Sequence, residues 1–175
     1  MPVIYDASLN DIPVIRRVAE NTWWSTYSSI ISDEQIRYML DTIYSAEELS
    51  RVMKNGSQMF IILSDENGPQ GYASFGLRPE NSEICKLHKL YMQPENQGKG
   101  YGKMLIDEVI KRLQPEVRYL ELNVNRHNKA KDFYQRVGFK ILREEDVSIG
   151  PYWMNDYVMR LDVMNASWYR AKSQI

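Results

Sequence analysis

A glycine-rich loop constrains the fold of this chain more than any other segment. The run Gln97-Gly98-Lys99-Gly100-Tyr101-Gly102 follows an apolar stretch typical of a strand, residues 84–92, and precedes an amphipathic helical stretch that Pro115 ends. Glycine lets the backbone turn tightly and bring successive N–H groups close to a ligand, and the start of a helix adds partial positive charge. The loop therefore predicts a site for phosphate or pyrophosphate, with a plain strand-to-helix turn as the alternative.

Two familiar phosphate-binding motifs do not fit this loop. The P-loop requires Ser or Thr directly after its lysine, whereas Gly100 follows Lys99 here. The dinucleotide-binding fingerprint has the spacing Gly-x-Gly-x-x-Gly, whereas the glycines of this loop stand at 98, 100 and 102. A different class of phosphate-bearing ligand is expected.

The order of the remaining segments predicts the architecture. We expect strands at residues 3–5, 58–64, 71–77, 84–92, 117–124, 139–142 and 157–163, with a long excursion joining the last two. Helices are expected after Ser8, Ser32 and Ser45, after the glycine loop, and over residues 130–137 with Gly138 at the end. No linker or repeat divides the chain, so we expect one α/β (α+β) domain over residues 1–175 rather than a doubly wound parallel fold.

Composition excludes several classes of protein. The formal net charge of −1, without a basic cluster, argues against nucleic acid or an anionic membrane surface as a partner. One cysteine, Cys85, and two histidines, His88 and His127, are too few for a zinc cluster or an internal disulfide, so no metal is expected. The first residues do not resemble a signal peptide, and no apolar stretch approaches the roughly 20 residues that span a bilayer, so a cytoplasmic location is expected.

Two segments resemble the GNAT superfamily of N-acetyltransferases. Residues 90–102 are similar to its coenzyme A motif, whose core is [Arg/Gln]-x-x-Gly-x-[Gly/Ala], and Ala130-x-x-Phe133-Tyr134-x-x-x-Gly138-Phe139 is similar to its second signature. The resemblance implies a mixed, mostly antiparallel seven-stranded sheet flanked by helices and splayed between strands four and five, with acetyl-CoA in the gap. By the same resemblance, the coenzyme is held by Leu90, Tyr91, Met92, Gln97, Gly98, Lys99, Gly100, Tyr101, Gly102 and Asn128. Asn125 is the alternative to Asn128, because His127 stands where the family usually has asparagine.

Acetyl transfer to nitrogen requires a neutral amine, although an alkyl amine with a pKa near 10 is mostly protonated at neutral pH. The resemblance implies that Tyr134 donates a proton to the leaving thiolate; the alternative is a core tyrosine beside Phe133. His88 is the first candidate for the base, because its unperturbed pKa suits proton transfer, and the alternative is a structural histidine. Glu83, acting through water, is the second candidate, and Cys85 is interpreted as a half-buried small residue.

The segments Trp23-Trp24-x-x-Tyr27 and Gly150–Met159 resemble the branch of the family that includes spermine/spermidine acetyltransferases. Aromatic faces and carboxylates attract a cationic amine. The candidates for acceptor binding are the aromatic residues Trp23, Trp24, Tyr27, Tyr152, Trp153 and Tyr157 and the acids Asp33, Glu34, Glu144, Glu145, Asp146 and Asp156. Helix packing of the tryptophans and a solvated turn at residues 144–146 are the alternatives.

The sequence therefore predicts an acetyl-CoA-dependent N-acetyltransferase whose acceptor is a small primary amine or a polyamine. A protein or peptide N-acetyltransferase and a non-catalytic acyl-CoA-binding regulatory module are the alternatives. The enzyme is compatible with a homodimer.

Overall fold

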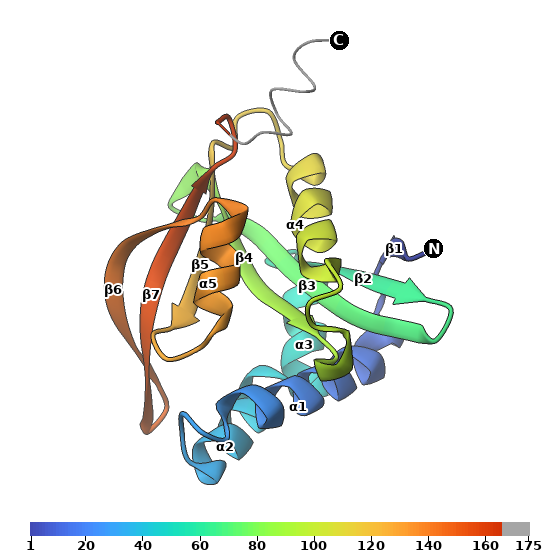
Figure 1. Ribbon diagram of the computed structural model, residues 1–175, viewed down its shortest axis with the longest axis vertical. Coiled ribbons are helices and arrows are strands. Elements are labelled where there is room, and N and C mark those ends of the chain that lie inside the picture. The colour runs from blue at the N-terminus through green and yellow to red at the C-terminus, as the bar shows by residue number, and fades with distance from the viewer. Residues whose placement is uncertain (166–175) are drawn as a thin grey trace. The chain divides into compact units, whose positions relative to one another are not determined.

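The computed structural model describes residues 1–165 of the chain, and its centre is a seven-stranded mixed sheet (Figure 1). The strands are β1 (Val3–Asp6), β2 (Met59–Asp65), β3 (Gly68–Arg78), β4 (Asn81–Met92), β5 (Tyr119–Asn125), β6 (Lys140–Ile149) and β7 (Tyr152–Asp162), in the spatial order β1-β2-β3-β4-β5-β7-β6. The pairs β1–β2, β2–β3, β5–β7 and β6–β7 are antiparallel. β4 and β5 are parallel, over the short ladder Ile84–Lys86 with Tyr119–Glu121, as expected of strands that splay. The predicted fold class is confirmed.

The helices begin and end where side-chain chemistry satisfies their free backbone groups. They are α1 (Ile12–Tyr27), α2 (Asp33–Ile43), α3 (Ala46–Lys54), α4 (Tyr101–Arg112) and α5 (Ala130–Val137). Ser8 forms a capping box with Asp11 at a short 3-10 turn that leads into α1. Ser32 and Ser45 accept hydrogen bonds from the third residue beyond each, both at 3.1 Å. Gly138 ends α5 with a φ of +119°, a conformation that favours glycine. No helix among residues 1–165 is long and apolar enough to cross a membrane.

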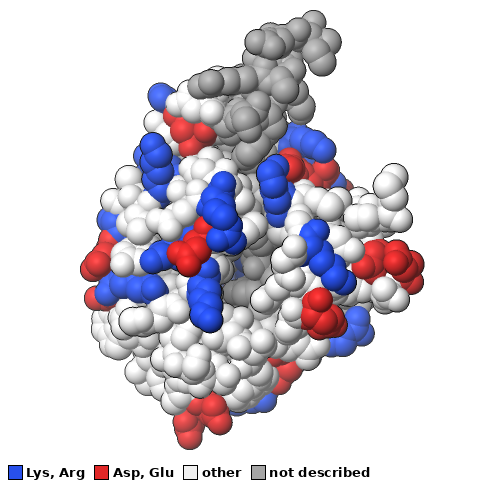
Figure 2. All heavy atoms as spheres, viewed as in Figure 1, with Lys and Arg blue, Asp and Glu red and all other residues white. Residues whose placement is uncertain are grey.

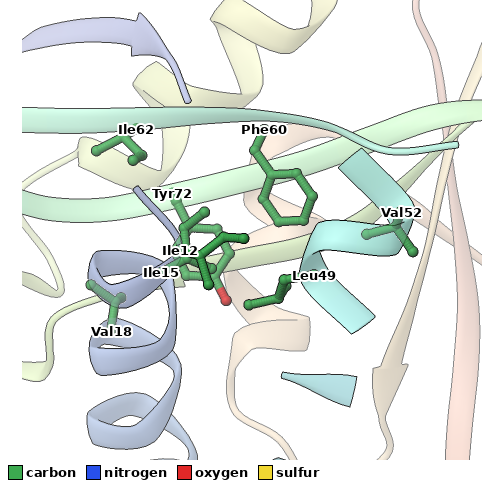
Figure 3. Packing of buried hydrophobic residues seen from close by; sticks show 8 residues of the cluster. All are labelled: Ile12, Ile15, Val18, Leu49, Val52, Phe60, Ile62 and Tyr72. Atoms are coloured by element: carbon green, nitrogen blue, oxygen red, sulfur yellow. The ribbon is translucent and has the colours of Figure 1, made fainter. Parts of the chain in front are cut away.

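The chain divides into two compact units, and each has its own interior. The first comprises Met1–Gly76 and His88–Lys111; the second comprises Leu77–Leu87 and the described residues from Arg112 onward. In the first unit α1 and α3 pack against the β2–β3 hairpin (Figure 3). Their apolar residues recur at helical spacing and meet alternate residues of the strands. The resulting core contains Ile12, Ile15, Val18, Leu49, Val52, Phe60, Ile62 and Tyr72.

The second unit is dominated by the long β6–β7 hairpin, which Figure 1 shows as a curved two-stranded ribbon. The expected excursion between residues 142 and 157 is wrong, because both strands continue through it and a two-residue turn, Gly150-Pro151, joins them. β6 lies at the edge of the sheet, where charged side chains are exposed to water on a regular strand. The acidic run at residues 144–146 is therefore part of a strand, and the alternative of a solvated turn does not hold.

Candidate active site

The glycine loop adopts a backbone conformation suited to an anion. Gly98 and Gly100 have φ values of +84° and +83°, on either side of Lys99, whose φ is negative. Such an alternation is the conformation of a nest, a concave arrangement of successive backbone N–H groups that binds anions. A Cβ atom added to either glycine would meet no heavy atom within 4 Å, and residues 97–100 are exposed. Because α4 begins at Tyr101, the N–H groups of its first turn and the helix dipole add to the positive potential there.

The tip of the β2–β3 hairpin fixes the start of α4. The Tyr101 hydroxyl donates a hydrogen bond to Asp65 Oδ2 at 3.0 Å, and Gln70 Nε2 donates to Asp65 Oδ1 at 3.0 Å. Gln70 in turn accepts a hydrogen bond from the buried amide of Asn96, in the turn that leads to the glycine loop. The backbone N–H of Asn67, followed by the Tyr101 and Gln70 bonds, holds the pKa of Asp65 below its usual range, so Asp65 stays ionised as an acceptor. Sequence reasoning missed this contact between segments 36 residues apart.

Behind the loop lies a polar depression of about 380 Å³. Its lining is Arg17, Asn67, Pro69, Gln70, Gln93, Glu95, Asn96 and Lys99. Lys99 Nζ donates a hydrogen bond to Asn96 Oδ1 at 2.5 Å, which holds this charge beside the turn that leads into the glycine loop.

The family's second signature lies in the second unit. Tyr134 on α5 is 8% exposed, with its ring centroid 5.3 Å from Phe133 and 5.6 Å from Phe139. Asn128 Oδ1 accepts a hydrogen bond from the Ala130 N–H at 2.9 Å, and Asn125 Oδ1 accepts one from the His127 N–H at 3.0 Å. Both candidate asparagines thus use their side-chain oxygens to shape the turn between β5 and α5.

Asp156 belongs to a polar cluster on β5, β6 and β7. The Asn123 side-chain N–H₂ donates to Glu145 Oε2 at 2.8 Å and to Asp156 Oδ2 at 3.3 Å. Asp156 is 7% exposed, and burial raises the pKa of its carboxyl despite the hydrogen bond from Asn123. Sequence reasoning found both acids and missed Asn123.

Most of the chain matches one protein family. Residues 28–159 match the model of the acetyltransferase (GNAT) domain. The chain belongs to the GNAT acetyltransferase family. Basic side chains, with acidic ones among them, lie over α5 in the view of this GNAT acetyltransferase that Figure 2 shows.

Three similar proteins place this GNAT acetyltransferase within the family. Spermidine N(1)-acetyltransferase of Thermoplasma acidophilum is 28% identical over 137 residues, which cover 77% of this chain and 85% of the relative. An uncharacterized N-acetyltransferase of Mycobacterium tuberculosis is 25% identical over 153 residues, covering 86% and 97%. The crystal structure of PaiA N-acetyltransferase from Thermoplasma acidophilum in complex with coenzyme A superposes with a TM-score of 0.77 at 27% identity, covering 93% of this chain and 99% of that one.

The residues of β4 that resemble the pantetheine-binding segment differ in their surroundings. The Tyr91 side chain is directed into the first unit, where its hydroxyl accepts a hydrogen bond from Tyr44 at 2.9 Å. The carbonyl of Met92 accepts a hydrogen bond from Thr22 on α1 at 3.1 Å, so that group is already engaged. Leu90 is half-buried.

The two candidate bases lie on the same strand without meeting. His88 is half-buried in the second half of β4, whereas Glu83 is exposed near its start. Five residues of a strand span about 16 Å, so the structure does not bring the two side chains together. Cys85, interpreted as half-buried, is in fact 1% exposed.

The amino-terminal aromatic residues divide between the core and the surface. Trp23 and Tyr27, 4% and 6% exposed, stack with ring centroids 4.4 Å apart, and Tyr44 lies 5.7 Å from Trp23. Trp24 is nearer the surface: its Nε1 donates to Glu20 at 2.9 Å. Trp23 and Tyr27 thus contribute to packing, and their role in acceptor binding stays a prediction. Asp33 and Glu34 lie in the first turn of α2, where their negative charges interact favourably with the positive end of the helix dipole.

A buried lysine beside this aromatic group was not foreseen. Lys89 is 6% exposed; its Nζ donates to Gln58 Oε1 at 2.8 Å and lies 5.6 Å from the ring centroids of Tyr44 and Phe60. The signal that could have found it is strand alternation, which places Lys89 in step with the buried Leu87.

The carboxy-terminal candidates also separate. Glu144 and Asp146 pair with Arg126 at 3.7 and 2.6 Å, on the opposite side of β6 from Glu145. Arg126 also lies 5.9 Å from the ring of Tyr157. Tyr152 is half-buried, and Trp153 is 58% exposed. The side chains of Glu145 and Asp156 share the amide of Asn123 as a hydrogen-bond donor.

Proposed function

We propose that this GNAT acetyltransferase transfers the acetyl group of acetyl-CoA to a primary amine of a small molecule, with polyamines as preferred acceptors. The observation that carries the proposal is the exposed nest at Gly98 and Gly100, which lies directly before the first residue of α4 and suits an anion. The nest would hold the pyrophosphate of the coenzyme through backbone N–H groups. Similarity to a spermidine N(1)-acetyltransferase and to a coenzyme A complex supports both substrates.

In the proposed reaction, His88 acts as the base and Tyr134 as the acid. The amine loses a proton to His88, directly or through water, and its lone pair attacks the thioester carbonyl carbon. The new C–N bond forms, the C–S bond breaks, and the thiolate takes a proton from the Tyr134 hydroxyl. The proton that the attacking nitrogen then loses restores that hydroxyl through solvent. The products are the N-acetylated amine and coenzyme A. Because a thiolate with a pKa of about 8.5 leaves readily, the acid contributes less than the base.

Thiol release from acetyl-CoA in the presence of an amine panel tests the proposal. The panel contains spermidine, a diamine, a monoamine and a lysine-containing peptide, and mass spectrometry identifies the acetylated product. We expect rapid acetylation of the small amines, with spermidine or the diamine preferred. Coenzyme binding without thiol release for any amine would contradict catalysis. Acetylation of the peptide alone would contradict the small acceptor.

A further inference from the structure

Three polar side chains from separate strands of the second unit meet on one face of the sheet. Glu145 of β6 stands opposite Asp156 of β7, and Asn123 of β5 is the diagonal neighbour of Asp156, because Asn123 pairs with Val158. Diagonal and opposite neighbours on one face of a sheet are within reach of each other. The amide of Asn123 therefore bridges the two carboxylates through its two N–H donors.

The bridge leaves two buried acceptors without donors. Asn123 Oδ1 and Asp156 Oδ1 have no hydrogen-bonding partner among the described residues. Reversing the amide would turn an oxygen toward both carboxylates, so the orientation of Asn123 is set by its neighbours. A buried acceptor without a donor is costly, and an atom bearing several protons would satisfy both oxygens.

Asp156 also lacks an ion pair. Among the described residues no cation lies within 4.0 Å of its carboxylate, although Lys86 and Arg126 attract it from farther away. Four arginines near the cluster have acidic partners elsewhere: Arg126 pairs with Glu144 and Asp146, Arg143 with Glu145, and Arg78 and Arg160 with Glu121. Lys86 is attracted to Glu145, Asp156 and Glu121 together. Among the described residues, Asn123, Lys86 and Arg126 therefore offset the desolvation of Asp156 only in part, and the pKa of its carboxyl stays raised.

We propose that Asp156, Asn123 and Glu145 form a subsite for an alkylammonium group of the acceptor. The inference rests on the proposed function and deepens it. The ammonium that is acetylated must lose its charge, so the cation held here is the second one of a diamine or polyamine. Its protons can be donated to carboxylate oxygens. Glu145, with a side chain 39% exposed, lies nearer the solvent, and Asp156 is buried. Such a site favours a slender primary ammonium over a guanidinium or a peptide chain.

The substitution Asp156→Asn tests the subsite, because it keeps the shape and removes the charge. The acceptors are 1,4-diaminobutane and 1-aminobutane, which differ only in the second ammonium. We expect the variant to raise the KM for the diamine at least tenfold, while the KM for the monoamine and the Kd for coenzyme A change less than twofold. Glu145→Gln should change the diamine KM in the same direction and by less. Asp162→Asn is the matched control: it removes an acid of the same strand that pairs with Arg118 at 3.5 Å.

Thermal unfolding gives a readout that does not depend on turnover. Burial raises the pKa of the Asp156 carboxyl, so its ionised form lowers the free energy of unfolding. This loss of stability is complete above the pKa in the folded protein and disappears below the unfolded value of about 3.9. At neutral pH, Asp156→Asn should therefore melt no lower than the wild type. At one fixed concentration of diamine, the Tm of the wild type should rise more than that of the variant.

Two results would overturn the subsite. One is a clear drop in the Tm of Asp156→Asn with an unchanged diamine KM, which indicates a structural carboxylate. The other is an equal rise in KM for the monoamine and the diamine. The Tm measurement also separates this inference from the proposed function: diamine stabilisation of a protein that acetylates no amine would retain the subsite and refute the enzyme. Acetylation of diamines unaffected by Asp156→Asn would do the reverse.

Discussion

Replacing Gly100 with alanine separates the backbone requirement of the loop from its role toward the coenzyme. The φ of +83° at Gly100 lies in the left-handed region, which costs an L-residue about 1–2 kcal/mol. No heavy atom lies within 4 Å of the added Cβ, so the cost is conformational and not steric. Gly56, just beyond the end of α3, offers a matched control, because its φ is +72° and its added Cβ also meets nothing.

Both substitutions should lower the free energy of unfolding by about 1–2 kcal/mol, or the Tm by roughly 2–8 °C for a chain of this size. Only Gly100→Ala should weaken the binding of coenzyme A. Its methyl group either stands over the nest or makes the loop relax to negative φ, and each outcome removes at least one backbone hydrogen bond to phosphate. A hydrogen bond to a charged group is worth about 1.5–3 kcal/mol, which corresponds to a roughly 10- to 150-fold increase in Kd.

Isothermal titration with coenzyme A measures the affinity, and thermal unfolding measures the stability. Equal coenzyme affinities for Gly100→Ala, Gly56→Ala and the wild type would refute the nest as the pyrophosphate site. An equal loss of affinity in both variants would also refute it, because the effect would then follow from lost stability alone.

Two further substitutions test neighbouring steps of the reasoning. Tyr134→Phe keeps the ring in its packing beside Phe139 and removes the hydroxyl, so steady-state turnover should fall by up to about 100-fold while the coenzyme Kd stays unchanged. Unchanged turnover would show that Tyr134 serves only in the packing of the core. Tyr101→Phe removes the hydrogen bond to Asp65 at the start of α4, so the coenzyme Kd measured by titration should rise severalfold without loss of the fold; an unchanged Kd would show that the hairpin does not fix the loop.

Features set by a few adjacent residues could be predicted from the sequence. Ser32 and Ser45 cap helices because their hydroxyls accept hydrogen bonds from backbone three residues on. Gly98 and Gly100 have positive φ values, which agrees with the tight turn that glycine was expected to allow there. These signals fix where elements begin and end without reference to distant parts of the chain.

The β6–β7 hairpin escaped prediction because its signals conflict. A buried strand shows alternating hydrophobicity, but an edge strand with one exposed face can carry consecutive acids, as Glu144, Glu145 and Asp146 do. The same residues are typical of a turn when their pairing partner is unknown. The pairing with β7, which places Glu145 opposite Asp156, supplied the missing information.

The acceptor subsite depends on register, and register is a long-range property. Asn123 meets Glu145 and Asp156 across 22 and 33 residues of sequence, and a slip of one residue on β6 would put Asp146 or Glu144 in place of Glu145. Neighbouring residues of the same type thus have different environments. Trp23 is buried, whereas Trp24 lies nearer the surface. Glu144 pairs with Arg126, whereas Glu145 accepts a hydrogen bond from the amide of Asn123. Residue types alone therefore cannot identify which acid binds a cation. The distinguishing property is a buried carboxylate oxygen that folding leaves without a donor, and among the predicted acids only Asp156 has one.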